Sequence, residues 1–254
     1  WVPVTVTQRE RVNQEGALWR RAKGDITDEQ YTDFYKHLTH DWEAPLAHTH
    51  FTVEGTQEMT GLLFVPSRGD GFLMGRKAPG LRLFVKRVFI LEDAEELLPE
   101  WLRFLRGVVD SEDLPLNVSR EFLQKNRVSN GIRKQVTKHA LRLLESLAEE
   151  EAAETAPKSG DADEGSETTE PKRRYTAFWT QYGRVLKEGV HYDHDNQERI
   201  AKLLRYPSSR DEGLTSLAAY VERMAEGQES IYYICAENAA AAAGSPHIEG
   251  LRAR

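Results

Sequence analysis

The sequence predicts a mixed α/β (α+β) protein with a large αβα sandwich lobe, a helical connector and a small αβα lobe. Three observations indicate this class. Strand-like apolar runs are mixed with helical patterns up to residue 131, and helical patterns alone fill residues 132–206. A last strand-like run, residues 231–235, is followed by an alanine-rich stretch that favours a helix.

The large lobe is predicted to begin with a helix over residues 27–41. Thr27 and Gln30 form a capping-box pattern at its start, and aromatic and leucine side chains then recur at helical spacing. Three further elements are predicted from apolar runs: strands at residues 50–53 and 62–65, and a strand buried on both faces over residues 81–91. A helix is predicted over residues 95–106 despite Pro99, which a helix tolerates only near its first turn.

Amphipathic patterns predict further helices in the second half of the chain. They cover residues 132–149, 175–186, 195–204 and 214–224, and the alanine-rich residues 238–243 are predicted as a helix from propensity. Asp195 and Glu198 are expected to cap the third of these, and Ser245 with Pro246 to start a last helix.

Composition excludes several classes of protein. The chain has 254 residues, a formal net charge of -7 and one cysteine. An acidic balance argues against nucleic-acid binding driven by phosphate contacts, and a single cysteine excludes an internal disulfide or a multi-cysteine zinc site. No uncharged apolar stretch is long enough to span a membrane. Cysteine usage fits a reducing compartment.

An acidic stretch, residues 149–171, interrupts the helical connector. It contains nine acidic residues against one lysine, and no aromatic, leucine, isoleucine or valine residue. Such a segment buries too little apolar surface to offset the entropy of ordering, so a disordered insertion is expected. The alternative is an interaction tail for a basic partner. Both ends of the chain have the character of cut ends, which suggests a segment of a longer protein.

Three patterns of chemical interest give weak signals. The glycine-rich loop 66–80 runs into a strand and lacks the lysine of a phosphate loop, so a mobile loop is the better interpretation. The pairs His48/His50 and His191/His194 could suggest a metal, and Asp193 and Asp195 could add oxygen ligands to the second pair; a zinc site needs three or four convergent ligands, which the spacing does not establish, so no metal is predicted. Cys235 lies in an apolar run and is expected to be a buried, inert thiol.

The stretch from Gly107 to Gln124 carries the strongest local signal. Ser119 suits a helix N-cap, so Arg120 would occupy the first turn, where free backbone N–H groups and the guanidinium together favour an anion. Gln124 lies one turn later on the same face. The alternative is that Arg120 pairs with Glu112 or Asp113.

Trp42 follows the first predicted helix. An aromatic side chain at a helix end usually belongs to the core, and this is the expectation from sequence. An exposed position would instead make Trp42 a binding candidate.

These stretches also carry a resemblance. The runs LTHDWE (38–43), HFTVEG (50–55), VKRVFI (85–90), GVVDSEDLPLNVSRE (107–121) and SIYYI (230–234) closely resemble the 90-kDa heat-shock (Hsp90) chaperone family, with its bacterial members as the nearest match. Phe178, Trp179, Gly183 and residues 186–189 match as well. The resemblance covers most of the chain and fits the family's middle domain.

The resemblance implies roles for individual residues. Arg120 matches the catalytic-loop arginine that reaches the ATP γ-phosphate, and Gln124 the catalytic glutamine of that loop. Asn117, Ser119 and Phe89 would support the loop. Trp42 matches a tryptophan implicated in binding client proteins.

The resemblance also implies a cytoplasmic, stress-responsive, ATP-driven homodimeric chaperone that binds unfolded client proteins and possible co-chaperones. ATP with Mg²⁺ would be bound by an N-terminal domain, so no activity is expected of this segment alone. The implied organisation is residues 1–26 as the end of that domain and a linker, 27–131 as the large lobe, 132–206 as the connector and 207–254 as a truncated small lobe. Nucleic acid and membrane are not expected partners. Two alternatives remain: a non-enzymatic adaptor module of the same fold, and a stand-alone α/β enzyme, for which no complete catalytic set is found.

Overall fold

A five-stranded sheet with the order β1-β2-β5-β3-β4 forms the centre of the molecule. The computed structural model describes residues 16–69, 80–117, 121, 123, 126–155, 173–210 and 213–248. The strands of the sheet are β1 (Ala47–Val53), β2 (Met59–Val65), β3 (Leu81–Val85), β4 (Val88–Leu91) and β5 (Arg106–Ser111). The strands β3 and β5 run parallel, and the other neighbouring pairs are antiparallel.

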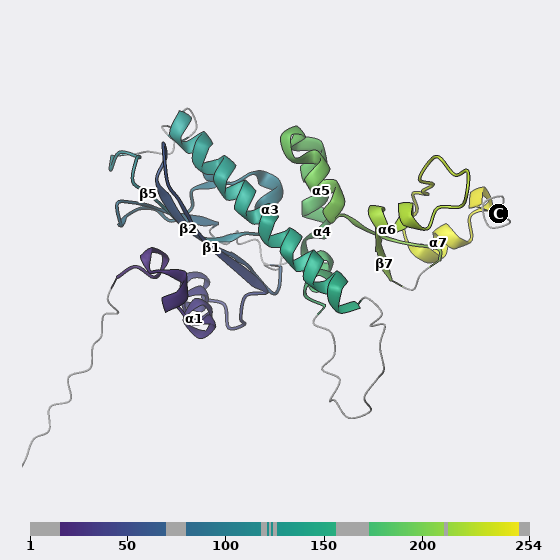
Figure 1. Ribbon diagram of the computed structural model, residues 1–254, viewed down its shortest axis with the longest axis horizontal. Coiled ribbons are helices and arrows are strands. Elements are labelled where there is room, and N and C mark those ends of the chain that lie inside the picture. The colour runs from purple at the N-terminus through teal and green to yellow at the C-terminus, as the bar shows by residue number, and fades with distance from the viewer. Residues whose placement is uncertain are drawn as a thin grey trace, which may run out of the picture.

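Alternate side chains of the central strands enter two different cores. On β2, Leu62 joins the core under α1 (Asp28–Thr39), whereas Leu63 joins the core under α3 (Arg127–Thr155). This alternation follows from the two-residue period of a strand. In Figure 1, α1 lies on one side of the sheet and α3 on the other. The large lobe is therefore the αβα sandwich predicted from the sequence.

The first helix and its capping box are confirmed. The backbone N–H of Gln30 donates to Thr27 Oγ1 (3.3 Å), and the backbone N–H of Thr27 donates to Gln30 Oε1 (3.1 Å). The two predicted strands that follow are β1 and β2, each starting three residues earlier than expected.

The run 81–91 is not one strand but a hairpin of β3 and β4. Lys86 and Arg87 have φ angles of 50° and 67°, the left-handed conformation that a tight hairpin turn requires at both central residues. The edge strand β4 leaves Val88 and Phe89 half-exposed. The prediction of a single strand buried on both faces was wrong because the turn carries neither Gly nor Asn, the usual signals.

Residues 95–106 do not form the predicted helix. Two short 3-10 turns, Glu95–Leu97 and Glu100–Leu102, take its place, and β5 begins at Arg106. Leu98 between them is extended (φ −126°, ψ 130°). The residue before a proline is driven out of the helical region by the proline ring, and Pro99 therefore divides the segment.

Two helices of the connector, α3 and α4, are longer than predicted, whereas the third, α5, is shorter. The helix α3 continues to Thr155, so the first residues of the acidic stretch are helical. The helix α4 (Arg174–Tyr192) confirms the amphipathic pattern around residues 175–186, and α5 (Gln197–Leu203) follows it. Asp193, rather than Asp195 or Glu198, caps the turn before α5, by accepting from the backbone N–H of Asn196 at 3.1 Å.

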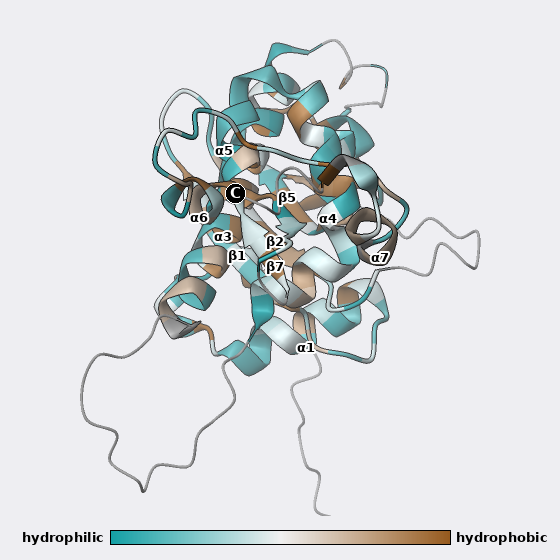
Figure 2. Ribbon diagram, turned by 90° about the vertical axis from the view of Figure 1, so that its right-hand side faces the viewer, coloured by the Kyte–Doolittle hydropathy of each residue, from teal (hydrophilic) through white to brown (hydrophobic). Residues whose placement is uncertain are grey.

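The small C-terminal part contains a two-stranded sheet of β6 (Arg205–Pro207) and β7 (Leu214–Ser216). Two short helices follow, α6 (Leu217–Glu222) and α7 (Ala239–Ala243). The helix α7 confirms the prediction from the alanine-rich sequence, and the Asn238 side chain caps its N-terminus. The predicted helix 214–224 thus starts with a strand. In Figure 2, α7 is a hydrophobic helix at the end of the molecule that faces the viewer.

Residues 231–235 do not form the predicted strand. They have no regular secondary structure, are exposed, and pair with no strand among the residues that the structure describes. A strand without ladder partners gains no sheet hydrogen bonds. Cys235 is exposed for the same reason, which corrects the expectation of a buried thiol.

Candidate functional site

The chain after β5 returns to the core at two leucines. Leu114 and Leu123 are both buried in the core under α3. Between them, Pro115, Leu116 and Asn117 are exposed. Ser119, Arg120 and Gln124 lie outside the described residues, so the geometry below concerns the segment that leads to them.

A network of hydrogen bonds fixes the turn that opens this segment. Ser111 Oγ accepts from the backbone N–H groups of Asp113 and Leu114, both at 3.3 Å. Across the turn, the N–H of Glu58 donates to Asp113 Oδ2 (2.7 Å) and the N–H of Glu112 donates to the carbonyl of Glu58 (3.0 Å). The start of the segment is therefore tied to the residue that precedes β2.

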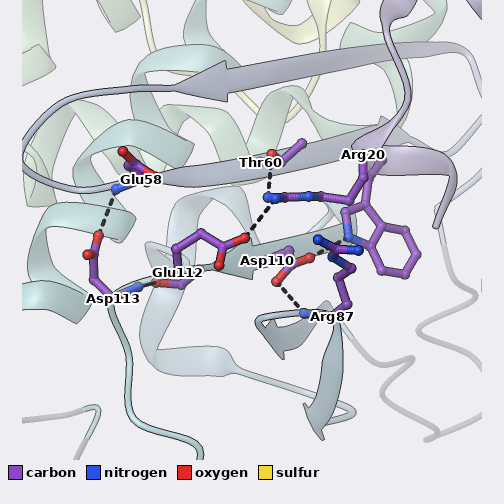
Figure 3. Close-up of polar contacts among 9 residues, drawn as sticks. Arg20, Glu58, Thr60, Arg87, Asp110, Glu112 and Asp113 are labelled. Atoms are coloured by element: carbon purple, nitrogen blue, oxygen red, sulfur yellow. Dashed lines mark hydrogen bonds and ion pairs between the residues drawn. The ribbon is translucent and has the colours of Figure 1, made fainter. Parts of the chain in front are cut away.

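The two acids that the sequence offered as partners for Arg120 have other partners. Glu112 Oε1 pairs with a guanidinium nitrogen of Arg20 at 2.7 Å, and Arg20 also donates to Thr60 Oγ1 at 3.4 Å. Asp113 accepts from the Glu58 backbone, as described above. Figure 3 shows both acids turned toward these partners.

Asp110, the last but one residue of β5, is wholly buried. Its Oδ2 accepts from the indole N–H of Trp19 (3.0 Å), and its Oδ1 accepts from the backbone N–H of Arg87 (3.1 Å). Sequence reasoning gave no role to Asp110, Trp19 or Arg20. The available signal was an acidic residue at the end of an otherwise apolar strand, where burial requires hydrogen-bond donors.

Phe89 lies at the same end of the sheet. Val85 of β3 pairs with Ser111 on one side and with Val88 on the other, so the start of β4 and the end of β5 lie at the same end of the sheet, with β3 between them. The Phe89 ring meets the Phe84 ring edge-on, with centroids 5.6 Å apart.

Trp42 lies near the opposite end of the sheet. Trp42 precedes β1, and the first residue of β1, Ala47, pairs with the last residue of β2. Ser111 instead pairs with the first residue of β2, Met59. The Trp42 side chain is 93 % exposed. The expectation that Trp42 belongs to the core is therefore wrong, because the described part of the fold places almost no neighbouring atoms over its ring.

The histidine pairs do not form metal sites among the residues that the structure describes, where no group of three or more His, Cys, Asp or Glu side chains converges. His50 uses both ring nitrogens elsewhere: Nδ1 bonds to the Tyr31 hydroxyl (2.9 Å) and Nε2 to the Trp19 carbonyl (2.8 Å). Burial lowers the pKa of His48 and of His50, which favours their neutral forms. Most of the glycine-rich loop, residues 70–79, lies outside the described residues.

The sequence also matches known proteins. A family model described as "Hsp90 protein" matches residues 2–254. This chain belongs to the Hsp90 family. The chaperone protein HtpG of Myxococcus xanthus is 52% identical over 250 residues, which are 98% of this chain and 35% of that protein. HtpG of Cupriavidus necator is also 52% identical, over 96% of this chain and 36% of that protein. The chain thus spans about a third of the length of these relatives.

A solved structure shows the same fold. The middle domain of a Plasmodium falciparum heat-shock protein is 33% identical, with a TM-score of 0.75 over 93% of this chain and 85% of that domain. The resemblance read from the sequence is confirmed. Along the described part of this Hsp90 chain, no helix is both long and apolar enough to cross a membrane.

Proposed function

We propose that this chain is the middle segment of an ATP-driven homodimeric chaperone that binds unfolded client proteins. Its membership of the Hsp90 family and its match to a third of HtpG support this function. In this proposal an N-terminal domain binds ATP with Mg²⁺, a C-terminal domain forms the dimer, and residues 27–131, 132–206 and 207–254 are the large lobe, the connector and the small lobe. Clients and co-chaperones are the expected partners.

We propose that Arg120 stabilises the γ-phosphoryl group of ATP during hydrolysis. Phosphoryl transfer needs positive charge on the oxygens that carry charge in the transition state, and an arginine from another domain can supply it. The observation that carries this role is the fixed turn after β5, in which Glu112 and Asp113 are held by Arg20 and by the Glu58 backbone. This arrangement supports an Arg120 that is available to a phosphate.

The neighbouring residues are given supporting roles in the same proposal. Gln124 would contact the reacting phosphate region from the next turn, and Asn117 and Ser119 would shape the loop. Phe89 would pack beside the loop, which its place at the same end of the sheet supports.

The test is ATP hydrolysis by the full-length chaperone that carries this chain. Arg120→Ala should lower kcat by about 10²-fold or more while nucleotide affinity changes little, because the lost contact forms in the transition state. Arg142→Ala, which removes an exposed arginine of α3, is the matched control and should retain wild-type turnover. Unchanged turnover in Arg120→Ala would overturn the proposed role and favour a non-enzymatic adaptor.

We also propose that Trp42 contacts client proteins. An exposed indole is costly to leave in water and offers a large apolar surface to an unfolded chain. The same preparations test this role: Trp42→Ala should weaken binding of an unfolded model protein several-fold. Tyr192→Ala, which removes another exposed aromatic ring, is the control. Equal binding by Trp42→Ala and wild type would contradict the proposal.

A further inference from the structure

Two adjacent residues before α1 reach across the sheet to the end of β5. Trp19 donates its indole N–H to Asp110, and Arg20 pairs with Glu112. These contacts lie on either side of Ser111, the last residue of the strand. The segment from 16 to 26 is thereby joined to the root of the loop that leads to Arg120 (Figure 3).

The Asp110 carboxylate connects three separate parts of the chain through hydrogen bonds. It belongs to β5, it accepts from the turn between β3 and β4 through the N–H of Arg87, and it accepts from Trp19. A wholly buried carboxylate requires such donors, since an unsatisfied one would be expensive. The carboxylate thus fixes the relative positions of all three parts.

The backbone is held at the same point from both neighbouring strands. The carbonyl of Ser111 accepts from the N–H of Lys86 (3.0 Å), and the N–H of Glu112 donates to Glu58 (3.0 Å). Arg20 adds a bridge from Glu112 to Thr60 on β2. A catalytic side chain on a loop must be held to within about 1 Å. Here the start of the loop is held from the β2 side, from the turn between β3 and β4, and by Trp19 and Arg20.

We propose that Trp19 and Arg20 are positioning residues for Arg120. Through Asp110 and Glu112 they hold the start of the loop where Arg120 reaches the phosphate. This inference rests on the proposed role of Arg120. A partly exposed ion pair contributes little to stability, so its removal should change turnover more than folding.

Charge reversal in the full-length chaperone tests the inference. Arg20→Glu and Glu112→Arg should each lower kcat about 10-fold with little change in KM. The double variant should regain most of the lost kcat, because it restores the ion pair in reverse. Asp110→Asn keeps the shape but places an amide N–H against one of two donors, and should also lower kcat. Circular dichroism and the thermal midpoint establish that each variant is folded at the assay temperature.

The matched control is a second ion pair, between Arg103 and Glu188. Its bonds are 2.5 and 2.8 Å long, and it lies near the opposite end of β5. Arg103→Glu should leave kcat unchanged. Wild-type kcat in Arg20→Glu and Glu112→Arg, or a double variant that regains nothing, would overturn the positioning role. If Arg120→Ala retains full turnover, the proposed function itself fails; if only Arg120→Ala is impaired, only the positioning role fails.

Discussion

His139 on α3 lies flat against the phenyl ring of Phe51 on β1. The ring centroids are 4.0 Å apart and the planes differ by 4°. Burial lowers the pKa of His139 to about 4, and the charges of Arg142, Lys138 and Lys23 act in the same direction. The neutral ring therefore packs as an apolar group, and protonation would put a charge into a half-buried aromatic contact.

Stability should fall as pH is lowered from about 6.5 to about 4. In this window the unfolded chain binds a proton at His139 and the folded chain does not, so lowering the pH stabilises the unfolded state relative to the folded one. Partial exposure reduces the effect to about 1–2 kcal/mol. Urea unfolding at pH 7.5 and at pH 5 measures it, and His139→Gln should lose less stability over this interval than wild type.

His191→Gln removes an exposed imidazole and serves as the comparison variant for this measurement. His48 and His50 remain in all variants, and burial lowers the pKa of each, so some loss of stability should persist. Identical losses in His139→Gln and wild type would show that the stacked ring is not the group that titrates.

A side chain of α3 caps the N-terminus of α4. Arg173, at the N-cap position of α4, makes no side-chain capping bond. Instead, Glu151 of α3 accepts from the backbone N–H of Thr176 (3.0 Å) and from its hydroxyl (2.5 Å). A carboxylate at a helix N-terminus satisfies a free donor and favours the helix dipole. This contact explains why α3 continues into the acidic stretch.

Removal of this cap should destabilise the connector. Glu151→Ala is expected to lower the free energy of unfolding by about 1 kcal/mol, the usual cost of a lost N-cap. Chemical denaturation followed by circular dichroism gives the value. Glu149→Ala changes an exposed acid of the same helix and should stay near wild type. A loss in Glu149→Ala as large as that in Glu151→Ala would assign the effect to charge rather than to the cap.

At the scale of the whole molecule, burial is concentrated in one part of the chain. Every buried hydrophobic side chain among the described residues lies between Leu18 and Leu204. Beyond Leu204, Val221, Ile231, Tyr232, Tyr233 and Ile234 are exposed, with Tyr233 at 86 %. The large lobe with its connector thus holds the core, and the C-terminal part adds little to it.

Hydrogen exchange should reveal this division. Amides of β2 and β5 in the centre of the sheet should exchange only on global unfolding, whereas those of residues 231–235 should exchange close to the rate of an unfolded chain, except that of Tyr232, which donates to the Tyr220 hydroxyl. Mass spectrometry of peptic fragments from this chain measures both. Strong protection over residues 231–235 would show that these side chains are covered in solution, contrary to the arrangement described here.

The sequence by itself determined the features that depend on local bonding or on contiguous motifs. The capping box of α1 involves residues three positions apart, and the stripe on α4 follows from helical periodicity. The run from Gly107 to Glu121 was sufficient to indicate the family. The turn at Lys86 and Arg87 was missed, although it is local, because its residues rarely adopt the left-handed conformation.

Only the tertiary structure decided the features that join distant residues. Trp19 and Asp110 are 91 positions apart, and Glu151 reaches Thr176 across 25. The exposure of Trp42 and Cys235 was equally inaccessible, because burial depends on which neighbours the fold supplies and not on the hydrophobicity of the residue. The start of the segment that leads to Arg120 is therefore held by contacts between distant parts of the chain, which its sequence motif does not reveal.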